Sequence, residues 1–206
     1  MMKKEWCKAL ILWGIAFMIL FAIQPIAAAE NLYSSVIRIH VVANSDSPRD
    51  QAVKLAVRDG IVSYAKENFS QLKSKKEAEA VIGSHLKEIE TLAAEIVEKA
   101  GENLPVTAVL EQEIYPTRRY EALSLPAGEY LSLQVRIGDA SGQNWWCVLF
   151  PPMCLNSALG AEDALIDAGM EEENAKLVTH DGERYRVRFK ILELWQGAKT
   201  KFKGLF

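Results

Sequence analysis

The first candidate site is a polar turn that follows an expected strand. His40 lies in the strand expected over residues 36–42, and Asn44, Ser45 and Asp46 form the turn behind it. A strand that turns tightly into a helix is a frequent place for an anion or a nucleophile. The same side chains also satisfy the free amides at the start of a helix. The turn is therefore either a site or a helix cap.

A catalytic role would depend on Cys147 and the three histidines. Cys147 and His40 would form a nucleophile and base pair if their strands were neighbours. His85 is expected on the wet surface of a helix and His180 beside a turn. The chain has no HExxH, G-x-S-x-G or CxxC motif and no glycine-rich phosphate loop. We therefore expect no metal, no cofactor and no enzyme activity, with an exported hydrolase that uses Cys147 and His40 as the alternative.

Aromatic and arginine side chains mark a second kind of candidate. Arg118, Arg119 and Tyr120 close a loop that starts at residue 115, and Trp145 and Trp146 lie side by side in an expected strand. Arginine beside tyrosine is typical of protein-binding hot spots. Salt bridges to acidic residues would explain the arginines without a partner. One indole should face the core and the other the opposite side of the sheet.

The N-terminal segment has the three parts of a secretory signal. Its first eight residues carry three lysines and one glutamate, residues 9–23 are all apolar or glycine, and Ala27-Ala28-Ala29 offers a cleavage site. The apolar run is shorter than the about 20 residues of a membrane span. Residues 1–29 are thus expected to be a signal peptide, and residues 30–206 a single domain.

The charge is unevenly distributed along the 206 residues, whose net charge is only -3. Residues 30–183 hold 14 Lys and Arg against 25 Asp and Glu, whereas residues 184–206 hold seven against one. An acidic body excludes a generally basic nucleic-acid binder. The basic C-terminal segment is expected either to contact anionic lipid at a membrane surface or to dock on the acidic body of the same chain.

Two cysteines follow the signal segment. Cys147 and Cys154 flank Pro151-Pro152, which could turn the chain back and bring the two sulfur atoms together. Export permits such a disulfide, and a loop this short would contribute roughly 2 to 3 kcal/mol. Two unpaired buried thiols are the alternative.

The elements that must position these residues follow from hydrophobic periodicity. Strands are expected over 36–42, 106–115, 129–137 and 144–150, with a hairpin loop at 138–142, and a last hairpin over 177–179 and 184–190. Helices are expected over 48–69, with Ser47 as N-cap and burial between layers, and over 74–100. The predicted fold is a single α+β domain, a mostly antiparallel sheet with a long helical hairpin packed on it.

Five segments in this order resemble the stage II sporulation protein R family of endospore-forming bacteria. They are Val36–Ser47, Asp50-Gln51 with Lys54-Leu55 and Val57–Asp59, Tyr115–Tyr120, Leu125–Tyr130 and Gly142–Pro152 with Cys154. The resemblance implies a secreted signalling protein that is made in the forespore and enters the space between forespore and mother cell. There, proteins of this family trigger a membrane-embedded aspartic protease of the mother cell, which cleaves the precursor of the early mother-cell sigma factor.

On that resemblance the chain is a protease activator and has no proteolytic activity of its own. The expected partner-binding residues are His40, Asn44, Ser45, Asp46, Arg118, Arg119, Tyr120, Trp145 and Trp146. No nucleic-acid partner is expected.

Overall fold

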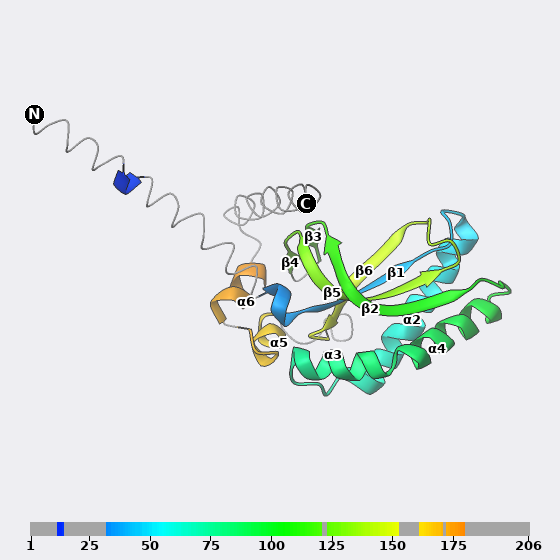
Figure 1. Ribbon diagram of the computed structural model, residues 1–206, viewed down its shortest axis with the longest axis horizontal. Helices are drawn as coiled ribbons and strands as arrows, with labels where there is room; N and C mark the ends of the chain where they lie inside the picture. The colour runs from blue at the N-terminus through cyan, green and yellow to red at the C-terminus, as the bar shows by residue number, and fades with distance from the viewer. Residues whose placement is uncertain (1–11, 15–31, 121–122, 153–160, 171, 180–206) are drawn as a thin grey trace, which may run out of the picture.

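Four strands form one mixed sheet at the centre of the molecule (Figure 1). The computed structural model describes residues 12–14, 32–120, 123–152, 161–170 and 172–179. The sheet order is β2-β5-β1-β6, where β1 is Ile37–Val42, β2 is Val106–Tyr115, β5 is Gly128–Ile137 and β6 is Asn144–Phe150. Strands β1 and β5 are parallel, and the other two pairs are antiparallel. The predicted α+β domain with a mostly antiparallel sheet is confirmed.

Alternation along the strands sorts side chains onto two faces. Ile37, Ile39 and Val41 of β1 are fully buried in the main apolar cluster, which the helices cover. The intervening positions of β1 are also buried, so this strand is enclosed on both faces. A second layer must therefore cover the sheet on the side away from the helices.

Three helices cover one face of the sheet. They are α2 (Pro48–Phe69), α3 (Lys75–Ser84) and α4 (Leu86–Lys99), and Ser47 caps α2 by accepting a hydrogen bond from the Asp50 amide at 3.0 Å. Burial of α2 between layers was wrong, because its buried residues follow one stripe while Leu55 is exposed. The packing of α2 on α4 is close, since a Cβ on Gly60 would lie 2.3 Å from Ile96 Cδ1.

The expected helix over 74–100 is interrupted at His85. The His85 backbone leaves helical geometry, with φ -100° and ψ 7°, and ends α3 where α4 begins. The imidazole is half-buried, and its ring lies 5.6 Å from Phe69 and 6.2 Å from Tyr64 between centroids. The prediction of a wet surface histidine was therefore wrong, since the bend turns His85 toward the C-terminal end of α2.

The loop at 138–142 does not join neighbouring strands, as the predicted hairpin required. Strand β1 lies between β5 and β6, and the loop crosses its C-terminal end. Gly138 has φ +57°, and a Cβ there would lie 2.1 Å from Asn44 Oδ1. Gly142 donates a hydrogen bond to the Ala43 carbonyl at 3.0 Å. The two glycines thus let the loop pass directly over the end of β1.

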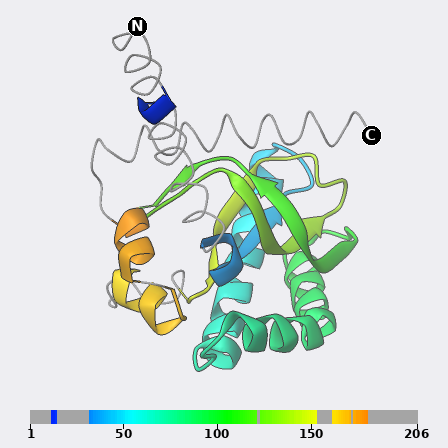
Figure 2. The ribbon, with the colours of Figure 1, turned by 60° about the vertical axis from the view of Figure 1, so that its left-hand side comes forward.

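Short elements cover part of the other face. The ribbon of β3 (Arg118–Arg119) and β4 (Ser124–Leu125) lies there with α5 (Ala161–Asp167) and α6 (Glu172–Thr179), forming a second buried cluster around Tyr115 and Tyr130. Figure 2 shows α5 and α6 apart from the three larger helices.

Two further predictions concern α6 and the N-terminal segment. The strand expected over 177–179 was wrong, because these residues end α6, and residues 184–190 lie outside the described residues. Most of the signal segment, 1–11 and 15–31, also lies outside them. Within the described ranges, no helix has the length and apolar character needed to cross a membrane.

Candidate interaction surface on the polar face of the sheet

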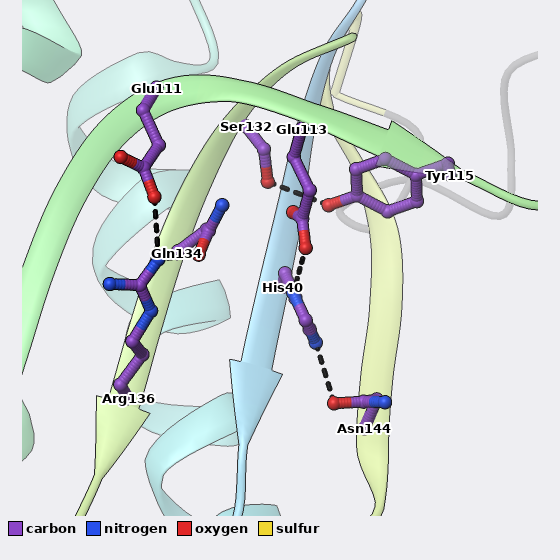
Figure 3. Close-up of polar contacts among 8 residues, drawn as sticks. All are labelled: His40, Glu111, Glu113, Tyr115, Ser132, Gln134, Arg136 and Asn144. Atoms are coloured by element: carbon purple, nitrogen blue, oxygen red, sulfur yellow. Dashed lines mark hydrogen bonds and ion pairs between the residues drawn. The ribbon is translucent and has the colours of Figure 1, made fainter. Parts of the chain in front are cut away.

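The strand register gathers polar side chains on the sheet face away from α2, α3 and α4, here called the polar face. His40 on β1 lies opposite Gln134 of β5 and Trp146 of β6, so these side chains share this face. By the same alternation, the polar face carries Arg38, His40, Glu111, Glu113, Ser132, Gln134, Arg136 and Asn144. Figure 3 shows all of these but Arg38.

A hydrogen-bonded chain crosses the polar face from β2 to β6. His40 Nδ1 lies 2.7 Å from Glu113 Oε1, and His40 Nε2 lies 2.8 Å from Asn144 Oδ1 (Figure 3). His40 thus contacts a side chain on each of the outer strands β2 and β6. His40 is only 7% exposed, so these two contacts hold its imidazole in one orientation.

The contacts of Glu113 lower the pKa of its carboxyl. Burial alone would raise the pKa of its carboxyl, but hydrogen bonds and the attraction of His40 hold the pKa below its ordinary value. The nearby hydroxyls of Tyr115 and Ser132, which hydrogen-bond to each other at 2.6 Å, also favour the carboxylate to a lesser extent. Glu113 Oε2 is buried without a hydrogen-bond partner. The polar face therefore holds a carboxylate whose second oxygen is unsatisfied.

Arg38 is a buried cation held by aromatic rings. Its side chain is 0% exposed, its guanidinium lies 3.8 Å from the Tyr115 ring centroid and 5.1 Å from that of Tyr130, and Nη2 donates a hydrogen bond to the Tyr120 hydroxyl. Its Nε and Nη1 have no hydrogen-bond partner. Cation–π attraction to these rings thus stabilises the buried charge in place of a carboxylate partner. Burial raises the pKa of all three tyrosines, which stay neutral beside it.

The predicted arginine and aromatic residues meet at the edge of the polar face. The Arg118 guanidinium lies 3.8 Å from the Trp146 ring centroid, and Trp146 lies 5.3 Å from the His40 ring. Arg118 and Trp146 are half-buried, whereas Arg119, the next residue of β3, is exposed. The structure thus joins His40, Arg118, Tyr120 and Trp146 in one region, with Arg119 on its surface.

The turn residues Asn44 and Ser45 are engaged with helix α2. Asp50 Oδ2 accepts hydrogen bonds from Asn44 Nδ2 at 3.0 Å and from Ser45 Oγ at 2.5 Å. These two bonds, first that of Ser45, hold the pKa of the Asp50 carboxyl below its ordinary value. Together with Ser47 they complete the entry of α2, which is the cap chemistry foreseen as one alternative.

The same turn also holds the loop that follows β5. Asn44 Oδ1 accepts from the Asp139 amide at 2.9 Å, and Asp46 Oδ1 accepts from the Gln143 amide at 2.7 Å. Asn44 and Asp46 therefore connect this turn to a loop about a hundred residues away in the chain. All three turn residues lie beside the polar face instead of on it. Binding of a partner through them stays a prediction.

Neighbouring residues of β6 lie on opposite faces. Trp145 packs against the main apolar cluster, with the Arg58 guanidinium 5.6 Å from its ring, whereas Trp146 packs against the second cluster. The predicted alternation of the two indoles is confirmed. Cys147 pairs with Ile39 and packs on the helix side, so it shares no face with His40 although β1 and β6 are neighbours.

The second cysteine of the predicted disulfide, Cys154, lies outside the described residues. The pairing of Cys147 with Cys154 stays a prediction. The described residues contain no group of three or more His, Cys, Asp and Glu side chains placed to hold a metal ion.

Sequence reasoning missed several residues of the polar face, chiefly Arg38, Glu113 and Asn144. Each lies two positions from another residue of this face, Arg38 from His40, Glu113 from Glu111 and Asn144 from Trp146, which was a visible signal of a shared face within each strand. Which side chains meet across the sheet depends on strand order, which local patterns do not reveal. The centre of this face, with Arg38, His40 and Gln134, is buried. Its margin, where Glu111, Arg136 and Arg119 are exposed, is the part open to recognition of another protein.

Comparisons with known proteins point in one direction. The family model described as stage II sporulation protein R matches residues 33–159. Stage II sporulation protein R of Bacillus subtilis (strain 168) is 40% identical over 131 residues, which are 64% of this chain and 57% of that protein. The match thus spans little more than half the length of this relative. No solved structure matches the chain significantly.

Proposed function

Because the chain belongs to the stage II sporulation protein R family, we propose that it is an exported signalling protein of sporulation. In this proposal the forespore makes it, and it activates the membrane-embedded aspartic protease of the mother cell that processes the early mother-cell sigma factor precursor. The observation that carries the proposal is the family match over residues 33–159, which include all four strands of the sheet. The match supports the family's role, and the partner is part of the proposal.

The proposed location is the space between forespore and mother cell. Support comes from residues 1–29, whose lysines, apolar run and Ala27-Ala28-Ala29 site form the pattern of a cleavable signal. A disulfide between Cys147 and Cys154 would be compatible with that compartment. Contact of the basic C-terminal segment with a membrane surface is a further part of the proposal.

The proposed partner surface is the region around β3, at the edge of the polar face. Arg119 is exposed, and its neighbour Arg118 is held by Trp146 at 3.8 Å. A fixed arginine beside an exposed one is a suitable anchor for a protein partner. Binding would shift a weakly active protease toward its competent arrangement, for example by favouring its dimer.

In this proposal the chain is a ligand and not an enzyme. The pair that would favour the hydrolase alternative, Cys147 and His40, lies on opposite faces of the sheet. Purified Cys147→Ala and His40→Ala variants should therefore match the wild-type chain in any assay of peptide or cell-wall hydrolysis. A turnover that only these variants lose, while folded, would contradict the assignment as a ligand.

Processing of the sigma factor precursor in sporulating cells tests the proposal. The assay uses cells that lack their own family member and express either the full chain or a chain without residues 2–29. The full chain should restore cleavage of the precursor, and the chain that stays in the forespore should not. Cleavage with the retained chain, or none with the exported chain, would contradict the proposal.

A further inference from the structure

Strand β2 is an edge of the sheet whose outer backbone groups remain available. Among the described residues it pairs only with β5, and Figure 1 shows it along one margin of the sheet. The Gly138 amide donates to the Pro105 carbonyl at 2.8 Å, which begins the ladder between the two strands. From this pair onward, odd-numbered residues of β2 direct their backbone groups to β5, and even-numbered residues direct theirs outward.

A side chain accepts the outward backbone amide at one end of this edge. The Ala108 amide points outward and donates to Glu90 Oε2 of α4 at 3.2 Å. Beyond it, Leu110, Gln112 and Ile114 have no recorded partner for their outward amides in the part of the chain that the structure describes. The Ile114 side chain is 60% exposed. Unpaired edges of this kind are templates for another strand.

The two faces of this edge differ in chemistry. Glu111 and Glu113 lie on the polar face, whereas Leu110 and Ile114 lie on the opposite face by alternation. A strand added here would match the edge if basic residues alternated with apolar residues. A second copy of β2, paired antiparallel about Gln112, would instead place Glu111 opposite Glu113, which is unfavourable.

The chain itself contains a segment with the matching alternation. In residues 184–191, Tyr185, Val187, Phe189 and Ile191 alternate with Arg184, Arg186, Arg188 and Lys190. When Glu113 is opposite Arg186 in an antiparallel pair, Glu111 falls opposite Arg188. In this register Tyr185 falls opposite Ile114, and Phe189 opposite Leu110. One register therefore places a basic residue opposite each glutamate and an aromatic residue opposite each of the two apolar side chains.

The position of α6 makes this pairing reachable. Val178, near the end of α6, belongs to the same buried cluster as Tyr115, the last residue of β2. Four residues separate Thr179 from Arg184, and the five steps between them span up to about 17 Å at roughly 3.3 to 3.6 Å per residue. A strand that enters beside Tyr115 then runs antiparallel to β2, toward the end that Glu90 closes.

We propose that residues 184–191 dock on the open edge of β2 as an additional antiparallel strand of the sheet. The strand covers an edge that would otherwise be open to other chains. It also ties the basic segment to the acidic body, and leaves Lys199, Lys201 and Lys203 beyond the sheet. This inference does not depend on the proposed function.

Hydrogen exchange at single amides of β2, followed by NMR on the full mature chain, tests the docking. Leu110, Gln112 and Ile114 should exchange about a hundredfold slower in the wild-type chain than in a full-length Val187→Pro/Phe189→Pro variant, because a strand paired 99% of the time protects by about that factor. The amides of residues 109, 111 and 113 bond to β5 and should not change. They provide a control on the same strand.

A matched variant, Thr200→Pro/Phe202→Pro, places two prolines at the same spacing outside the segment and should keep the slow exchange. Equal rates for Leu110, Gln112 and Ile114 in the wild-type chain and the Val187→Pro/Phe189→Pro variant would overturn the proposal. Protection that depends on protein concentration would indicate a second copy instead and would also overturn it. Free exchange of the three amides, with residues 184–191 protected only when anionic vesicles are present, would also overturn the proposal.

Discussion

The contact between His40 and Glu113 gives a quantitative prediction for the polar face. In a Glu113→Gln variant the amide oxygen can still accept from His40 Nδ1, now 2.7 Å from the carboxylate, but the charge is lost. A hydrogen bond to a charged group contributes about 1.5 to 3 kcal/mol, and a neutral one about 0.5 to 1.5 kcal/mol. The free energy of unfolding should therefore fall by about 1 to 2 kcal/mol.

A matched substitution two residues away should have a smaller effect. Glu111 shares the face and strand of Glu113, but its pair with Arg136, 2.5 Å between the charged atoms, has side chains 48% and 42% exposed. Exposed ion pairs contribute at most about 1 kcal/mol. Glu111→Gln should thus lower the free energy of unfolding by about 0.5 kcal/mol or less. Urea unfolding of the purified mature chains at neutral pH measures both.

The effect of Glu113→Gln should depend on pH in a defined direction. The pKa of Glu113 in the folded chain lies below its ordinary value of 4.5, so the carboxylate stabilises the fold above about pH 4.5. This contribution is lost as the pH falls through the folded pKa. The difference between the wild-type chain and the variant should therefore shrink in acid. A difference that stays constant from pH 7 to pH 3 would contradict this assignment.

A double-mutant cycle separates the pair from its surroundings. His40→Leu alone leaves the Glu113 carboxylate without its partner, whereas His40→Leu with Glu113→Gln removes the uncompensated charge as well. The double variant should be at least about 1 kcal/mol more stable than the sum of the single effects predicts. Additive effects would refute a direct coupling between the two side chains.

Two further comparisons test the loop and the ribbon. Gly138→Ala should lower the free energy of unfolding by about 2 to 3 kcal/mol, and Gly101→Ala by about 1 kcal/mol. Both glycines have positive φ, but only a Cβ on Gly138 would overlap Asn44, at 2.1 Å. Equal losses in urea unfolding would contradict the close approach of Gly138 to Asn44. Arg118→Ala should cost about 1 kcal/mol through the lost contact with Trp146, 3.8 Å from the guanidinium. Arg119→Ala should change the unfolding free energy by less than about 0.5 kcal/mol, and the reverse order in thermal unfolding would contradict their placement.

The parts of the fold that depend on local patterns could be predicted from the sequence. The strands β2 and β6 have the predicted bounds, and α2 begins at Pro48 behind its Ser47 cap and ends at Phe69. These features follow from alternation and from capping residues within a few positions. The strand expected over 177–179 failed because α5 and α6 pack on Tyr115 and Tyr130, a tertiary contact that overrides the local signal.

Strand order was the information that the sequence did not contain. The loop at 138–142 predicts a hairpin on its own, but β1 fits between β5 and β6 because all its side chains are apolar or find partners there. The same insertion brings His40 to Glu113 and Asn144, which lie more than 70 residues away along the chain. For this reason, His40 could be singled out from the sequence while its partners could not.

The most direct test of the account is cleavage of the sigma factor precursor in sporulating cells that express an Arg119→Glu chain. Arg119 is exposed on β3, so reversing its charge should leave export and folding unchanged and abolish cleavage. The matched control is Arg49→Glu, an exposed arginine at the start of α2 that should support normal cleavage. Normal cleavage with Arg119→Glu, or the same loss with both variants, would contradict a partner surface at β3.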